Sequence, residues 1–84
     1  MVDDSLIRQY CSRNGLRFEW ATRTEGDRAH ASLRIWRGDE SLFWQGTNGC
    51  YSEQALLDRL MHVAIEDIEA APPHYVISGW KPSQ

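Results

Sequence analysis

Apolar residues near the N-terminus are spaced as on one face of a helix. The cap-type residue Ser5 precedes them, and Asp3 and Asp4 place negative charge where a helix begins. Asn14-Gly15 is a suitable end, because glycine closes a helix in the left-handed conformation without a Cβ clash. The pattern therefore predicts a short amphipathic helix, whose apolar positions are Leu6, Ile7, Tyr10 and Cys11.

Further along the chain the period changes to two, which is typical of half-buried strands. Residues 17–24 and 29–37 alternate between apolar and polar, and residues 41–45 form an aromatic segment too short for a helix. Gly26 and Gly38 mark turns between them, so the pattern predicts three antiparallel strands in a meander. The inward positions are Phe18, Trp20, Thr22, Ala29, Ala31, Leu33 and Ile35, and the outward ones include His30, Ser32, Arg34 and Trp36.

A second amphipathic helix is predicted after Ser52, which is a cap-type residue, with Glu53 in the first turn. Pro72-Pro73 ends this helix, since prolines cannot continue its hydrogen-bond ladder. The tail 72–84 contains the apolar run 75–80, and we expect it to dock on the domain or on a partner. The apolar stripe of the helix is Leu57, Leu60, Met61, Ala64, Ile65 and Ile68.

The order helix, three strands, helix predicts an α+β fold of two layers, with a three-stranded antiparallel sheet and both helices on one face. The other face of the sheet stays open. The chain has 84 residues and 42% hydrophobic content, so we expect one domain over residues 1–71. No segment approaches the roughly 20 apolar residues of a membrane span, and no signal peptide is recognisable, so we expect an intracellular protein, cytoplasmic or nuclear, without membrane contact.

The charge is unevenly distributed and slightly negative. The net charge is −3 at pH 7, which does not favour binding of the whole surface to polyanions. Residues 1–49 hold seven Arg and seven acidic residues, whereas residues 50–84 hold two basic and five acidic ones. Eight of the nine basic residues are Arg, which suits planar, bidentate or stacked contacts.

The element order resembles the double-stranded RNA-binding domain (dsRBD) family across residues 5–69. The resemblance implies a module that lies across the minor grooves of duplex RNA and reads shape with little sequence preference. In the first helix, Gln9 stands where the family places a minor-groove contact, and Arg8 and Arg13 are within reach of phosphates. The residues that carry the resemblance are Leu6-Ile7-Arg8-Gln9-Tyr10-Cys11, Asn14-Gly15-Leu16, Gly26 with His30, and Gly46 to Gly49 before Ala55.

Two departures from the family pattern weaken the expectation of RNA binding. The Lys-Lys-x-Ala-Lys motif of the second helix is replaced by Ser52-Glu53-Gln54-Ala55-Leu56, so three phosphate-binding lysines are missing. The Gly-Pro-x-His motif of the first hairpin is replaced by Gly26-Asp27-Arg28-Ala29-His30. Weak, shape-selective binding of double-stranded RNA remains an alternative, through Arg8, Gln9, Arg13, Arg28 and His30.

The main prediction is a non-catalytic dsRBD-like module for protein–protein interaction or homodimerisation, because the family includes members that have lost RNA contacts. The resemblance suggests an RNA-processing or RNA-silencing setting. Trp36 has outward parity, and either Phe43 or Trp44 must also point outward. The alternative is that the tail covers these aromatics. The predicted interface residues are Trp36, Phe43, Trp44, Tyr75 and Trp80.

Enzymatic and metal chemistry are not expected. Cys11 and Cys50 lack metal-ligand spacing, and we expect both to be buried. His62 and Glu66 are spaced as a surface pair on one helix face. No nucleophile, base and orienting group can be assembled from the sequence, so we predict no catalytic residue, no cofactor and no metal. The carboxylates Asp58, Glu66, Asp67 and Glu69 are interpreted as a solvated or partner-facing helix surface.

Overall fold

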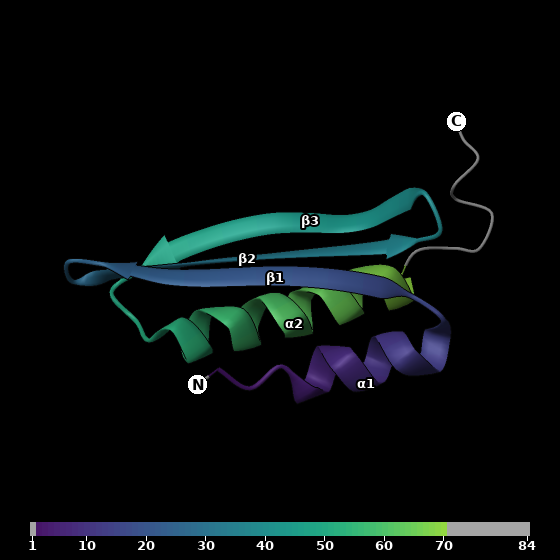
Figure 1. The fold of residues 1–84 in the computed structure, drawn as a ribbon, viewed down its shortest axis with the longest axis horizontal. Helices are drawn as coiled ribbons and strands as arrows, with labels where there is room; N and C mark the ends of the chain where they lie inside the picture. The colour runs from purple at the N-terminus through teal and green to yellow at the C-terminus, as the bar shows by residue number, and fades with distance from the viewer. Residues whose placement is uncertain (1, 71–84) are drawn as a thin grey trace.

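The computed structural model describes residues 2–70 and confirms the predicted α+β fold. Both helices lie on one side of a three-stranded antiparallel sheet, and the other side of the sheet is open (Figure 1). The elements in chain order are α1 (Ser5–Asn14), β1 (Arg17–Glu25), β2 (Arg28–Arg37), β3 (Glu40–Gly49) and α2 (Glu53–Ala70).

The sheet is a meander in the order β1-β2-β3, so β2 is central and β1 and β3 are its edges. β3 is longer than the sequence pattern predicted, because it continues through Gly46–Gly49. These residues are opposite Ala29–Ser32 of β2, and ladder hydrogen bonds to β2 outweigh their poor strand propensity. One irregularity occurs between Ile35 and Trp36, where the register shifts and Leu42 becomes an extra residue of β3.

The core lies between the sheet and the helices. α2 packs against all three strands, while α1 packs against β1 and α2. Leu33, Ile35 and Leu57 are completely buried at the centre of this layer. Two helix positions differ from the predicted stripes: Leu6 is 39% exposed, whereas Leu56 is buried. Leu6 therefore lies at the margin of the apolar face of α1, which Ile7, Tyr10 and Cys11 form.

α1 ends and α2 begins as their sequences indicate. Gly15 follows α1 with a φ of 65°, and its conformation allows the chain to turn directly into β1. At the other helix, the Ser52 hydroxyl oxygen accepts a hydrogen bond from the Ala55 amide at 3.0 Å. The conformation of Gly15 thus lets β1 follow α1 directly, and the Ser52 cap fixes the first turn of α2.

The Asp4 carboxylate, just before α1, connects α1 with β1 at the N-terminal side of the domain. It accepts a hydrogen bond from the Trp20 indole Nε1 at 2.8 Å and forms an ion pair with Arg8 at 2.7 Å. The hydrogen bonds from Arg8 and Trp20 lower the pKa of this carboxyl group below its ordinary value. α1 is thereby fastened to β1 through a side chain that stays ionised.

Three expectations about single residues are modified. Cys11 is buried as expected, and burial raises the pKa of its thiol, but Cys50 is exposed in the loop after β3. His62 does not pair with Glu66 and instead places Nδ1 2.8 Å from the Asp58 carbonyl oxygen. The carboxylate of Glu69 has a structural contact, because it accepts a hydrogen bond from the Tyr10 hydroxyl at 2.6 Å. This bond and burial raise the pKa of Tyr10 to about 12.

Two expectations cannot be compared directly with the structure. The predicted docking of tail 72–84, with Tyr75 and Trp80, lies outside the described residues. The same holds for the domain boundary at residue 71. Within residues 2–70, neither helix is long and apolar enough to cross a membrane.

Candidate functional site

The open face of the sheet carries two large aromatic side chains that the helices do not cover. Trp36 is half-buried, and Trp44 of the adjacent strand is 72% exposed. Phe43 points to the opposite side and is buried in the core. Of the two aromatics of β3, Trp44 is therefore the one that points outward. The prediction that Phe43 is an interface residue is wrong, because its side chain is part of the core.

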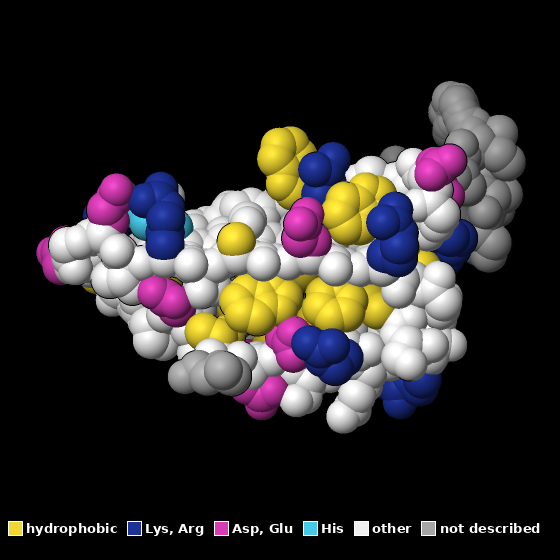
Figure 2. Space-filling model, in the orientation of Figure 1, with side chains coloured by type: hydrophobic (Ala, Val, Ile, Leu, Met, Phe, Trp, Pro, Cys, Tyr) yellow, Lys and Arg dark blue, Asp and Glu magenta, His cyan; other side chains and the backbone are white. Residues whose placement is uncertain are grey.

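Two arginines alternate with these tryptophans, and we call the set Arg17, Trp36, Arg34 and Trp44 the Arg–Trp row. The Arg17 guanidinium carbon lies 4.9 Å from the centre of the Trp36 ring. The Arg34 guanidinium carbon lies 5.1 Å from the Trp36 ring and 5.3 Å from the Trp44 ring. These distances are within the range of cation–π contacts. Figure 2 shows hydrophobic and basic side chains, with an acidic one among them, on the side of the sheet away from the helices.

The strand register produces this row. Arg17 is directly opposite Trp36 in the β1–β2 pair, and Arg34 is directly opposite Trp44 in the β2–β3 pair. Because side chains alternate across each strand, all four reach the same face. Three strands thus contribute to one continuous surface.

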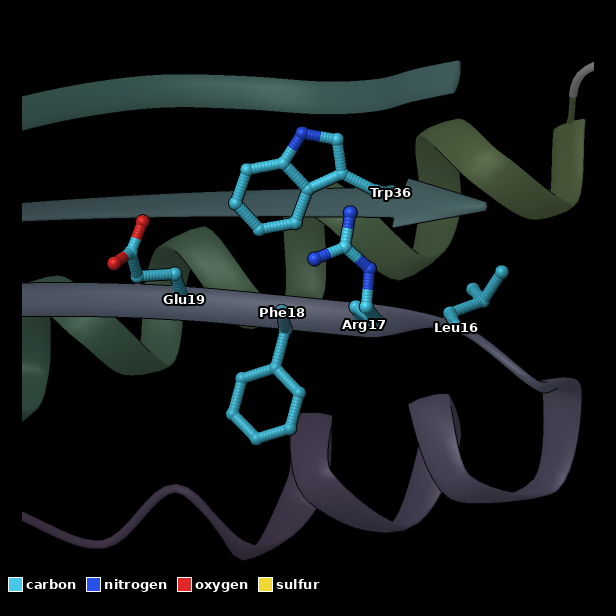
Figure 3. Close-up of a pocket in the computed structure, with 5 residues that line it drawn as sticks. All are labelled: Leu16, Arg17, Phe18, Glu19 and Trp36. Atoms are coloured by element: carbon cyan, nitrogen blue, oxygen red, sulfur yellow. The ribbon is translucent and has the colours of Figure 1, made fainter. Parts of the chain in front are cut away.

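The row continues into a shallow hollow at the free edge of β1. The hollow is lined by Leu16, Arg17, Phe18, Glu19 and Trp36. Figure 3 shows that Arg17 and Glu19 lie on the same side of β1 as Trp36, whereas Phe18 points toward α1. The hollow therefore has apolar walls on both sides of β1, which is an edge strand of the sheet that residues 2–70 form.

The two arginines of the row differ in their remaining contacts. Arg17 donates a hydrogen bond to the Gly38 carbonyl oxygen at 3.1 Å, which holds it beside the β2–β3 turn. Arg34 is directly opposite Glu19 on β1, but no ion pair joins them, and Arg34 takes part in none of the ion pairs within residues 2–70. The guanidinium of Arg34 is thus stacked on two indoles while its charge is not neutralised.

At the other end of the open face, the basic side chains contact polar or acidic neighbours. Arg23 forms an ion pair with Glu25 at 3.0 Å, and His30 Nε2 lies 3.5 Å from the same carboxylate. Arg28 donates a hydrogen bond to the Asn48 side-chain oxygen at 2.6 Å. Because Asn48 is uncharged, Arg28 keeps its positive charge, so the open face is positive at this end and at Arg17 and Arg34 of the Arg–Trp row.

The five residues predicted to contact duplex RNA do not form one surface. Arg8, Gln9 and Arg13 belong to α1 on the helical side of the sheet, whereas His30 lies on the open side. Arg28 is on the open side as well, by its parity in β2. Arg8 is ion-paired with Asp4 and stacks on Phe18, with the guanidinium carbon 5.5 Å from the ring centre. Gln9 and Arg13 are exposed.

The start of α2 carries negative charge at the place where the dsRBD family has lysines. The Glu53 carboxylate accepts hydrogen bonds from the hydroxyls of Thr22, at 2.7 Å, and Thr24. These bonds lower the pKa of Glu53, so the group is ionised at neutral pH. The Gln54 side chain donates hydrogen bonds to the Asp3 carbonyl and to the Asp58 carboxylate. The negative charge of this surface would repel a polyanion.

The sequence analysis missed Arg17 and Arg34 as members of the site. Arg34 could have been found, since it is two residues before Trp36 on the same face of a predicted strand. The role of Arg17 depends on the exact register between β1 and β2, which the sequence analysis did not predict. Among residues 2–70, His, Cys, Asp and Glu side chains form no group of three or more that could hold a metal ion.

Comparisons of the chain with family models, with curated proteins and with solved structures find no match.

Proposed function

We propose that this chain is a non-catalytic interaction module with a dsRBD-like fold, which binds protein through the open face of its sheet. The partner is a second copy or another protein, and the resemblance of the element order suggests an RNA-processing or RNA-silencing setting. The observation that carries the proposal is the Arg–Trp row, with Trp44 72% exposed at its end. Trp and Arg are the residue types that most often supply binding energy at protein interfaces.

The charge distribution on the helical side supports a protein partner over duplex RNA. Affinity for duplex RNA comes mostly from contacts with phosphates. Here Glu53 is ionised at the start of α2, and Arg8 is already paired with Asp4. A phosphate backbone on this surface would meet repulsion where the family pattern provides attraction.

Replacement of Trp44 by Ala tests the proposal. We expect association to weaken by about tenfold or more, because removal of a central interface tryptophan often costs over 2 kcal/mol. The fold should be retained, since the side chain is largely exposed. Sedimentation over a range of concentrations measures self-association, and retention of purified candidate binders on the immobilised chain measures binding of other proteins.

Tyr51→Ala is the matched control for this experiment. Tyr51 is an aromatic residue of similar exposure, 65%, in the loop between β3 and α2. The Tyr51→Ala substitution should leave association unchanged. The proposal is wrong if the wild-type chain sediments as a monomer throughout and binds no protein, or if both substitutions have the same effect.

Weak binding of double-stranded RNA is a second candidate, favoured by one observation. Arg13 is exposed in the last turn of α1 and forms no ion pair within residues 2–70. We expect Arg13→Glu to lower the affinity for a duplex and to reduce the salt slope by about one. Glu53→Lys should raise the affinity, because it replaces a charge that repels phosphates with one that attracts them. Titration of both variants with duplex RNA at two salt concentrations checks this, and unchanged affinity in both would exclude the candidate.

A further inference from the structure

The guanidinium of Arg34, which has no ion pair within residues 2–70, defines the chemistry that the open face can recognise. The guanidinium carbon lies over the rings of both Trp36 and Trp44, at 5.1 and 5.3 Å from the ring centres. Stacking of this kind covers the plane of the group and leaves the N–H groups at its edge for hydrogen bonding. Because the side chain is already held, less conformational entropy is lost when a ligand binds.

A carboxylate is the protein group that fits such an edge best. Guanidinium and carboxylate form two parallel hydrogen bonds, and these charge-assisted bonds are about twice as strong as neutral ones. Inside the domain, Glu19 is the carboxylate nearest in register to Arg34, but no ion pair between them is formed. The site for a carboxylate on Arg34 is therefore not filled by the described part of the chain.

The surroundings of Arg34 add a requirement for hydrophobic groups next to the carboxylate. The exposed Trp44 is directly opposite Arg34 on β3, and Trp36, which lines the hollow at the edge of β1, is two residues along β2. Arg17 provides a second positive charge beyond Trp36, 4.9 Å from its ring. Positive and apolar groups thus alternate across the three strands.

We infer that the open face binds an extended segment of a partner protein in which acidic and hydrophobic side chains alternate, with a carboxylate on Arg34. This inference rests on the proposed protein-binding function of the same face. The hydrophobic side chains of the segment contact Trp44 and Trp36, and a second carboxylate reaches Arg17. Charge complementarity selects an acidic partner.

Two features of the face favour an acidic protein segment over a nucleic acid. Glu19 lies beside the row and repels a continuous line of phosphates more than it repels separated carboxylates. Of the other arginines of the face, Arg23 is ion-paired with Glu25, and Arg28, which keeps its charge, lies at the first residue of β2, away from the row. A phosphate backbone lying across the row would therefore find two available cations, Arg17 and Arg34, which supply little affinity beside the carboxylate of Glu19.

Fluorescence anisotropy of labelled peptides with the full chain tests the inference. The probe is an extended peptide in which Glu alternates with Phe and Leu, and the matched peptide has Gln in place of each Glu. We expect the Glu peptide to bind at least about tenfold more tightly than the Gln peptide, with an affinity that falls as salt is added. A single-stranded RNA oligonucleotide serves as the competing class of ligand.

Four variants test whether the Glu peptide binds at the Arg–Trp row. Arg34→Gln should lower the affinity for the Glu peptide by about tenfold or more, and Arg34→Lys should recover only a small part, because lysine lacks the planar fork. Glu19→Gln should raise the affinity severalfold, since it removes a repelling charge. Arg23→Gln is the matched control on the same face, and it should change the affinity less than about twofold because Arg23 is paired with Glu25.

The inference is overturned if both peptides bind equally, if Arg34→Lys binds as well as the wild type, or if the RNA binds more tightly than the Glu peptide. The Trp44→Ala experiment separates this failure from failure of the proposed function. If Trp44→Ala disrupts protein association but no acidic peptide binds, only the partner chemistry is wrong. If Trp44→Ala also has no effect, both proposals fail.

Discussion

Substitution of Leu57 by Ala is expected to lower the free energy of unfolding by about 2–5 kcal/mol. Leu57 is completely buried on α2, where it packs between the helix and the sheet. The loss combines the transfer free energy of the removed methyl groups with the cost of the cavity that remains. Domains of this size have a total stability of about 5–15 kcal/mol, so the variant is expected to be partly unfolded at moderate temperature. Urea denaturation followed by circular dichroism measures the change.

Leu6→Ala is the matched control for the core prediction. It removes the same atoms from a leucine on the other helix, but Leu6 is 39% exposed and lies at the edge of the buried stripe. We expect a loss of less than about 1 kcal/mol, since less apolar surface returns to water and no closed cavity forms. Equal losses in the two variants would contradict the position of the core described above.

The second large effect is expected at Asp4. Replacement by Ala removes the ion pair with Arg8 and leaves the half-buried Trp20 indole N–H without its acceptor at 2.8 Å. Loss of a partly buried hydrogen bond to a charged group costs about 1.5–3 kcal/mol. Urea denaturation at neutral pH measures the loss. Asp67→Ala is the control, because it removes an exposed carboxylate near the end of α2 and is expected to change stability by less than about 0.5 kcal/mol.

The same carboxylate produces a dependence of stability on pH. Its pKa in the folded protein is lowered from the ordinary value of 3.8, so below that value the unfolded state binds more protons than the folded state. The stabilisation by Asp4 is therefore complete at pH values well above 3.8 and is lost as the pH falls through the lowered pKa. Unfolding measured at neutral pH and at successive pH values below 3.8 should show a smaller decline for Asp4→Asn than for the wild type. Identical declines would show that Asp4 is not responsible.

Much of the fold follows from the periodicity of the sequence. A strict alternation from Ala29 to Trp36 has only one assignment of faces that buries the apolar residues, so the inward and outward sides of β2 could be predicted. Gly15 and Ser52 likewise act through local backbone chemistry, and both caps are as predicted. β3 could not be predicted in full, because the strand character of Gly46–Gly49 depends on pairing with β2 and not on their own propensity.

The candidate site was only partly predictable for a similar reason. The parity of a strand shows that Trp36 points outward, and that one of Phe43 and Trp44 does so as well. Which of the two it is depends on the register between β2 and β3, including the irregularity at Ile35 and Trp36. The RNA-contact set was assembled from a linear family pattern, and the structure distributes it over both sides of the sheet.

The sequence by itself determined the order of the elements, the open sheet face and the negative charge at the start of α2, because these depend on local patterns and residue type. The tertiary structure decided which side chains are neighbours. Arg17 meets Trp36 and Arg34 meets Trp44 only through cross-strand register, and Asp4 meets Trp20 only because α1 packs against β1. Strand pairing and helix packing bring together residues that are distant in sequence. The free energy that stabilises these contacts comes from burial of the whole core rather than from the residues that are brought together.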